Sequence, residues 1–105
     1  MGMNNDSIAL TEAVYYILLS LCNPLHGYGI MQNVEELSKG RVKLAAGTLY
    51  GALNNLLEKG WIKAFDSDGR KKEYVITDTG RNAVKNEYDR LRELVKNGKF
   101  IFGGS

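Results

Sequence analysis

The chain contains few of the residues on which metal sites, disulfide-stabilised domains and many enzymes depend. Among its 105 residues are one cysteine, Cys22, one histidine, His26, and one proline. A single cysteine excludes an intramolecular disulfide and a cysteine-based metal cage. A single histidine excludes multi-histidine metal sites and most catalytic triads. We therefore expect a binding module, with no metal and no cofactor, rather than an enzyme.

Long apolar runs are absent as well. No stretch approaches the roughly 20 apolar residues that span a bilayer, and the first seven residues have no basic residue of the kind that begins a signal peptide. The hydrophobic fraction of 44% and the charged fraction of 25% are ordinary for a globular chain. We expect a single cytoplasmic domain with no membrane partner.

The net charge of +2 is small, but the charges are unevenly distributed. Residues 1–38 carry four acidic residues and no Lys or Arg, whereas residues 39–72 carry eight basic residues against three acidic ones. Clustered Lys and Arg are typical of surfaces that bind a phosphate backbone. A solvated basic face produces the same pattern, so the charge alone leaves both interpretations open.

Apolar spacing predicts four helices, over about residues 10–21, 27–38, 46–59 and 78–97. Asn23-Pro24 ends the first, because proline disfavours a helical residue before it. Residues 41–44 are expected to form a short extended segment before the third helix. Thr77 is the expected N-cap of the fourth.

Two β-rich segments, 61–65 and 72–77, flank an Asp-Gly pair that favours a hairpin turn. With the helices, they predict a mainly α fold with a small β-hairpin. We interpret residues 7–77 as a winged helix-turn-helix DNA-binding domain and residues 78–102 as a C-terminal dimerisation helix and tail, within one compact unit. A helix-turn-helix inserts its second helix into the major groove, which here is the helix over 46–59.

That helix has two unlike faces. At 100° per residue, its leucines and Ala52 form an apolar arc, and the opposite arc is polar or small. Hydroxyls and helix N-terminal N–H groups can bind phosphate, and asparagine amides can pair with an adenine edge. The candidate DNA-binding residues of the polar arc are Gly47, Thr48, Tyr50, Gly51, Asn54 and Asn55.

A basic triplet, Arg70-Lys71-Lys72, follows the hairpin tip. Cations at this position can contact phosphates or enter a minor groove, and we include all three among the DNA-binding candidates. Charged residues also protect hairpin edges from aggregation. A winged-helix module that binds proteins instead of DNA is the alternative, although such a module needs no cation cluster.

An ordered set of short motifs resembles the PadR family of bacterial transcriptional regulators over roughly residues 10–85. The motifs are Leu25-His26-Gly27-Tyr28, Gly47-Thr48-Leu49-Tyr50, Leu53, Gly60-Trp61-Ile62, Arg70-Lys71-Lys72-Glu73-Tyr74 and Thr77-Asp78-Thr79-Gly80-Arg81. The resemblance implies a dimeric winged-helix repressor that binds double-stranded DNA at a palindromic operator. Many members release DNA on binding a small, often aromatic, effector. Ala45-Ala46 stands where the family usually has Ser-Pro.

Residues for dimerisation are predicted on the first and last helices, through which short family members pair. Val84, Tyr88, Leu91 and Val95 are spaced four, three and four residues apart, which is typical of a seam between helices. This face could instead cover the chain's own core. From the first helix, Leu10 and Val14 complete the predicted dimer set.

Aromatic residues form the candidate effector pocket. They are Tyr15, Tyr16, Tyr88, Phe100 and Phe102, since flat molecules suit aromatic-lined pockets, although aromatic residues at helical spacing also occur in cores. Three possibilities stay open for the tail around Phe100: docking on a partner's first helix, lining a ligand site, or disorder. His26 is expected to be a structural hydrogen-bonding residue and Cys22 a small buried one.

Overall fold

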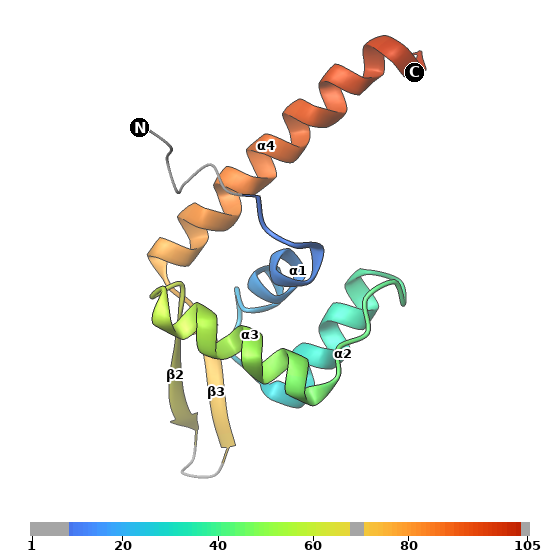
Figure 1. The fold of residues 1–105 in the computed structure, drawn as a ribbon. Helices are drawn as coiled ribbons and strands as arrows, with labels where there is room; N and C mark the ends of the chain where they lie inside the picture. The colour runs from blue at the N-terminus through green and yellow to red at the C-terminus, as the bar shows by residue number, and fades with distance from the viewer. Residues whose placement is uncertain (1–8, 68–70, 104–105) are drawn as a thin grey trace.

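The computed structural model describes residues 9–67 and 71–103, which form four helices and a three-stranded antiparallel sheet (Figure 1). The predicted fold class, mainly α with a small β-hairpin, is confirmed. In chain order the elements are α1 (Glu12–Ser20), β1 (Leu25–His26), α2 (Gly27–Leu37), α3 (Ala46–Glu58), β2 (Ile62–Ser67), β3 (Lys71–Ile76) and α4 (Asp78–Phe102).

Three of the helices begin at a side-chain cap. The Thr11 hydroxyl accepts the N–H of Val14 at 3.1 Å to start α1, and Thr77 caps α4 in the same way, as predicted. His26 Nδ1 accepts the N–H of Gly29 at 3.1 Å at the start of α2. The expected structural role of His26 is therefore confirmed. Caps of this kind typically contribute about 1 kcal/mol each.

The sheet has β3 in the middle, in the order β1-β3-β2. Ile62 pairs with Ile76 and Ala64 with Tyr74. Strand β1 pairs Leu25 with Tyr74. It is only two residues long, too short for a visible alternation, and it was not predicted. The extended segment expected over 41–44 is not a strand.

A single core draws on every helix and on the sheet. It consists of Ile17, Leu18, Leu21, Ile30, Val34, Leu49, Leu53, Leu56, Ile62, Tyr74, Ile76 and Val84. At Gly80 the first turn of α4 comes so close to the backbone carbonyl of Trp61 that a Cβ would collide with it. Cys22 is exposed, contrary to prediction, because α1 ends at Ser20 and Cys22 lies in the turn that follows.

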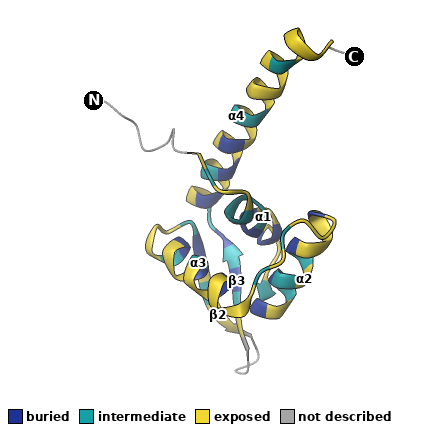
Figure 2. Ribbon diagram, turned by 45° about the vertical axis from the view of Figure 1, so that its right-hand side comes forward, coloured by how far each residue is buried: buried dark blue, intermediate teal, exposed yellow. Residues whose placement is uncertain are grey.

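Helix α4 is longer than predicted, with 25 residues. Its first half packs against the rest of the molecule and its second half projects away from it (Figure 1). Nearly all of this projecting half is exposed (Figure 2). The residues around Phe100 form the last turn of the helix, so the disordered-tail alternative is wrong. In the part of the chain that the structure describes, no helix combines the length and apolar character needed to cross a bilayer.

Candidate nucleic-acid interface

Helix α3 packs between α2 and β2 and buries one face completely. Leu49, Leu53 and Leu56 are 0%, 1% and 2% exposed. Ala52 and Leu57, at the flanks of this arc, are partly buried. The apolar arc predicted from the helical period is therefore confirmed, and it fixes which face of α3 points to solvent.

Helix α3 lies at the end of the molecule away from the projecting half of α4 (Figure 1), and its polar arc is exposed. A Cβ placed on either Gly47 or Gly51 would meet no atom within 4 Å, so packing does not require glycine there. Bare backbone on an outer face allows a ligand to approach closely. All the polar-arc candidates are exposed: Gly47, Thr48, Tyr50, Gly51, Asn54 and Asn55. Their contact with DNA stays a prediction.

The start of α3 differs from the other helix starts in having no side-chain cap. Its N-cap residue is Ala45, whose methyl group accepts no hydrogen bond. The N–H groups of a first helical turn have no acceptor within the helix, and they form the positive end of its dipole. The uncapped end of α3 lies at the same surface as Thr48, where both are suited to an anionic ligand.

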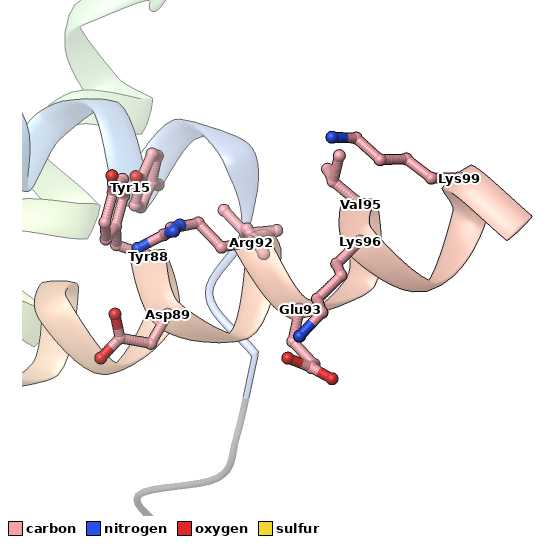
Figure 3. A pocket seen from close by; sticks show the side chains of 9 residues that line it. Tyr15, Tyr88, Asp89, Arg92, Glu93, Val95, Lys96 and Lys99 are labelled. Atoms are coloured by element: carbon pink, nitrogen blue, oxygen red, sulfur yellow. The ribbon is translucent and has the colours of Figure 1, made fainter. Parts of the chain in front are cut away.

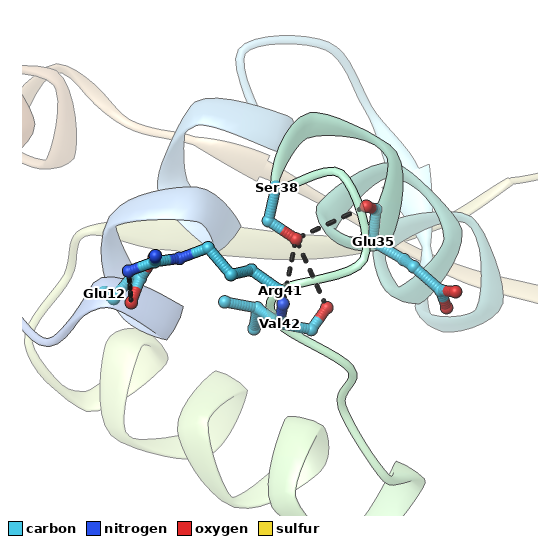
Figure 4. A network of polar contacts seen from close by, with 5 residues as sticks. All are labelled: Glu12, Glu35, Ser38, Arg41 and Val42. Atoms are coloured by element: carbon cyan, nitrogen blue, oxygen red, sulfur yellow. Dashed lines mark hydrogen bonds and ion pairs between the residues drawn. The ribbon is translucent and has the colours of Figure 1, made fainter.

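The loop that leads into α3 is held by two sets of polar contacts (Figure 4). The Ser38 hydroxyl donates to the carbonyl of Glu35 at 3.3 Å and accepts the N–H of Val42 at 2.9 Å. Arg41 donates to both carboxylate oxygens of Glu12 on α1, at 2.9 and 3.2 Å. This guanidinium holds the pKa of the Glu12 carboxyl below its usual value. Arg41 is therefore paired with Glu12 on α1. Of the basic residues in 39–72, it is one that is already engaged within the protein.

Tyr50 lies at the edge of the polar arc, on the side of α2. It is 45% exposed, and its hydroxyl lies against Gly27 so closely that a Cβ on that glycine would collide with it. Beside it Tyr74 is buried, and this burial raises the pKa of the Tyr74 hydroxyl, with a smaller contribution from Tyr50. Tyr50 and Tyr74 both line a recess that Tyr28 also lines, a residue whose role sequence analysis did not identify.

The hairpin β2–β3 extends from the same end of the molecule (Figure 1). Lys72 lies on β3 opposite Asp66 and its side chain is exposed. Lys71 begins β3. Arg70 and the side chain of Lys71, both predicted to bind DNA, lie outside what the structure describes. The described part of the wing therefore contributes Lys72 to the surface beside α3.

The predicted dimer residues are divided between the core and the surface. Val84 belongs to the chain's own core, so this part of the predicted seam already has an intramolecular partner. Leu10, Val14 and Leu91 are partly buried. Tyr88 and Val95, by contrast, are 46% and 64% exposed.

A buried carboxylate joins the start of α1 to α4. Glu87 is 5% exposed and accepts two hydrogen bonds from Arg90, at 2.9 and 2.7 Å. It also interacts with the backbone N–H of Leu10. The hydrogen bonds from Arg90 lower the pKa of the Glu87 carboxyl, and burial opposes them. This carboxylate thus adds a polar contact to the apolar packing between α1 and α4.

An open groove of about 840 Å³ runs along α4 beside Tyr15 of α1 (Figure 3). Tyr15 and Tyr88 lie at one end of it and Lys99 at the other. The guanidinium of Arg92 lies 5.8 Å from the centre of the Tyr88 ring. Two of the predicted effector residues, Tyr15 and Tyr88, thus meet, whereas Tyr16, Phe100 and Phe102 do not line this groove.

Within residues 9–67 and 71–103, no three His, Cys, Asp or Glu side chains lie together in a way that could hold a metal ion.

A family model described as the transcriptional regulator PadR-like family matches residues 16–86. An uncharacterized 37.1 kDa protein in transposon TN4556 of Streptomyces fradiae is 33% identical over 84 residues, which are 79% of this chain. The chain spans only 24% of the length of that curated relative.

The fold is shared with solved regulators. The crystal structure of a PadR family transcription regulator from Clostridium difficile R20291 matches with a TM-score of 0.75 and 21% identity, covering 88% of this chain and 99% of that one. The structure of BpsR from Bordetella bronchiseptica matches with a TM-score of 0.67 and 15% identity, covering 92% and 69%. DNA binding by BpsR is regulated by 6-hydroxynicotinic acid.

Proposed function

The chain belongs to the PadR-like family of transcriptional regulators, and from this premise we propose that it binds double-stranded DNA as a homodimer and represses transcription at a palindromic operator. The family consists of regulators and not enzymes. The observation that carries DNA binding is the position of α3, whose exposed arc lies beside the hairpin at one end of the molecule. Repression is proposed from the family resemblance, and action on the chromosome would place the protein in the cytoplasm.

In this proposal α3 enters the major groove and the hairpin contacts the flanking backbone. Asn54 and Asn55 are exposed on α3 and would read base edges through their amides. Thr48 and the uncapped first turn would bind phosphate oxygens. Lys72 would add a cation from the wing. Arg70 and Lys71 complete the proposed set from the sequence.

A second copy of the chain is proposed as the partner of α4. At 100° per residue, Val84, Leu91, Val95 and Phe102 fall on one stripe within roughly 40° of one another. The first half of this stripe packs on α1 and the core, whereas Val95 and Phe102 are 64% and 84% exposed. An exposed continuation of a core-facing stripe is typical of a face that a partner covers. Two-fold pairing also suits an operator with two half-sites about 34–36 Å apart.

The groove beside Tyr15 is the proposed effector site. Its tyrosine rings offer stacking surfaces. Its charged lining is net positive, with Arg92, Lys96 and Lys99 against Asp89 and Glu93. These groups suit a small aromatic molecule. The regulation of BpsR by 6-hydroxynicotinic acid supports this class of effector. Because the groove lies along α4, a bound molecule there would act on the spacing of the two proposed DNA-reading helices.

The test of DNA binding is selection of bound fragments from the host genome, followed by mobility-shift titration at 50 and 200 mM salt. We expect enriched fragments with a palindrome, and an affinity that falls as salt rises, with a slope of about −0.9 in log K for each phosphate neutralised. Lys85→Gln serves as a control, because Lys85 pairs with Asp89 on α4. Failure to enrich any fragment, or binding that salt leaves unchanged, would contradict the proposal.

A further inference from the structure

A cleft of about 640 Å³ opens beside the C-terminal half of α3, and nothing above assigns a ligand to it. Three parts of the chain line it: the start of α1, the stretch from the middle of α3 to Trp61, and the first turns of α4. It shares no lining residue with the groove beside Tyr15. The cleft is therefore a separate site, placed where α3 meets α1 and α4.

The walls of the cleft are apolar and mostly aliphatic. The side chains that form them are Leu10, Val14, Ala52, Leu56, Trp61 and Ala83. All of these except Leu56 are only partly buried, so the walls still present apolar surface to solvent. An alkyl chain suits such walls, because its burial removes apolar surface of both partners from water.

The polar side chains at the cleft can all donate hydrogen bonds. Lys59 places its ammonium nitrogen 5.4 Å from the centre of the Trp61 ring, and it forms no ion pair with the residues that the structure describes. Asn55 is exposed one turn earlier on α3. The Thr11 hydroxyl accepts the N–H of Val14, so its own proton can still donate. No carboxylate is among the described residues that line the cleft, and its charge therefore favours an anion.

The negative end of the α3 dipole is the feature that would oppose an anion here. Its last carbonyls are already occupied, since those of Asn55, Leu56 and Leu57 accept the N–H groups of residues 59–61 at 3.0 to 3.1 Å. Lys59 is itself the C-cap of the helix, where a cation offsets the dipole. The positive charge of Lys59 thus dominates at this side of the cleft.

A second copy of the chain is the rival occupant, because Leu10 and Val14 belong to the predicted dimer set. Charge complementarity favours an anion instead. The exposed apolar end of α4 carries Lys96 and Lys99 after its last acidic residue, Glu93. A copy that docked by this end would bring like charges towards Lys59.

We propose that the cleft binds a small aliphatic carboxylate, with its alkyl chain against Trp61 and the aliphatic walls and its carboxylate at Lys59. Binding itself does not depend on DNA. Its consequence for DNA rests on the proposed function, since Asn55, a proposed base reader, lines the same cleft. A carboxylate that engages the Asn55 amide opposes base reading. We therefore expect the carboxylate and the operator to weaken each other's binding by the same factor.

The fluorescence of Trp61 reports on the cleft, because it is the only tryptophan in the chain. We expect titration of the DNA-free protein with octanoate to change this emission saturably. From butyrate through hexanoate to octanoate, the affinity should rise by about fourfold for each added methylene. Octanamide has the same chain length without the charge and should bind about tenfold more weakly.

Two variants test the two parts of the site. Lys59→Gln removes the partner of the carboxylate and should lower octanoate affinity by about tenfold. Lys63→Gln is its matched control, because Lys63 is exposed on β2 and does not line the cleft. Ala83→Leu fills the cleft from α4 and should abolish the fluorescence response, whereas Asn82→Leu, at the exposed neighbouring position, should retain it. Circular dichroism checks that each variant is folded, and Lys59→Gln decides the question if Ala83→Leu is not.

The possible results separate this site from the proposed function. Octanoate that leaves Trp61 emission unchanged would overturn the site, as would equal octanoate affinity in Lys59→Gln and the wild type. Emission that responds to protein concentration and not to octanoate would show that a second copy occupies the cleft, and the site would again be wrong. A protein that binds octanoate as expected and binds no DNA would retain the site and contradict the proposed function.

Discussion

The two ends of the molecule expose opposite chemistry. At the end formed by α3 and the hairpin, Leu49, Leu53 and Leu56 are buried, and the exposed described residues are mostly polar, charged or small, with Phe65 as an apolar exception. At the end formed by the second half of α4, Leu94, Val95, Ile101 and Phe102 are all more than half exposed. The surface of α3 and the hairpin suits a polyanion. The surface of the second half of α4 suits an apolar helix of another molecule. This contrast supports the proposal of one surface for DNA and another for a further copy of the chain.

The largest effect is expected from a charge in the apolar end. Val95→Asp places a carboxylate in the stripe that we propose is covered by the partner, so we expect the dimer to dissociate in sedimentation experiments. Loss of the second half-site should lower operator affinity by about a hundredfold or more. Asn97→Asp adds the same charge two residues along, roughly 200° around the helix, and should leave the dimer intact. A dimer that survives Val95→Asp would remove this surface from the interface.

A smaller effect is expected from a single hydroxyl at the polar end. Thr48 is exposed on α3, and Thr48→Ala removes its proposed hydrogen bond to phosphate. We expect operator affinity to fall by about tenfold or somewhat more, measured by fluorescence anisotropy, with sedimentation unchanged. Wild-type affinity in this variant would exclude Thr48 from the interface. If Thr48→Ala instead altered the sedimentation of the dimer, the two ends of the molecule would not have separate roles.

The uncapped start of α3 offers a gain in stability. Ala45→Ser supplies the missing acceptor at the N-cap and should stabilise the fold by about 1 kcal/mol. Thermal unfolding at fixed protein concentration should rise by about 4–8 °C. Ala46→Ser, one position into the helix, is the matched control and should not raise it. Equal behaviour of the two variants would show that capping does not limit the stability of this helix.

The smallest expected effect is a change in pH dependence at the α1–α4 contact. Since the hydrogen bonds from Arg90 hold the pKa of the Glu87 carboxyl below the usual value of a glutamate, its charged form stabilises the fold above that usual value. This contribution is lost as the pH falls through the lowered pKa. Glu87→Gln should therefore be less stable at neutral pH and should lose less stability on acidification, as measured by urea unfolding. An unchanged pH profile would contradict the assigned role of the carboxylate.

Local patterns in the sequence predicted much of this architecture. The helical period placed Leu49 and Leu53 inside and Thr48 outside. Thr77 marked the start of α4, and the β-rich segments 61–65 and 72–77 marked the two strands β2 and β3. Each of these features depends on neighbours within a few residues, so each was visible in the chain itself.

Features that depend on distant contacts were not predicted. Strand β1 exists because Leu25 meets Tyr74, a partner almost fifty residues away. The recess beside α3 needs Gly27 to lie against Tyr50 and Lys72 to lie nearby. Cys22 follows the apolar stripe of α1 and was placed inside, but its helix ends first. In each case tertiary packing, and not local preference, decides the outcome.

NMR chemical-shift mapping with a selected operator fragment tests the division of surfaces most directly. With isotopically labelled protein, we predict that amide resonances of Gly47, Thr48, Gly51, Asn54 and Lys72 shift on addition of the duplex. Resonances from Val95 to Phe102 should stay where they are. Shifts concentrated in the second half of α4, with α3 unchanged, would contradict the account.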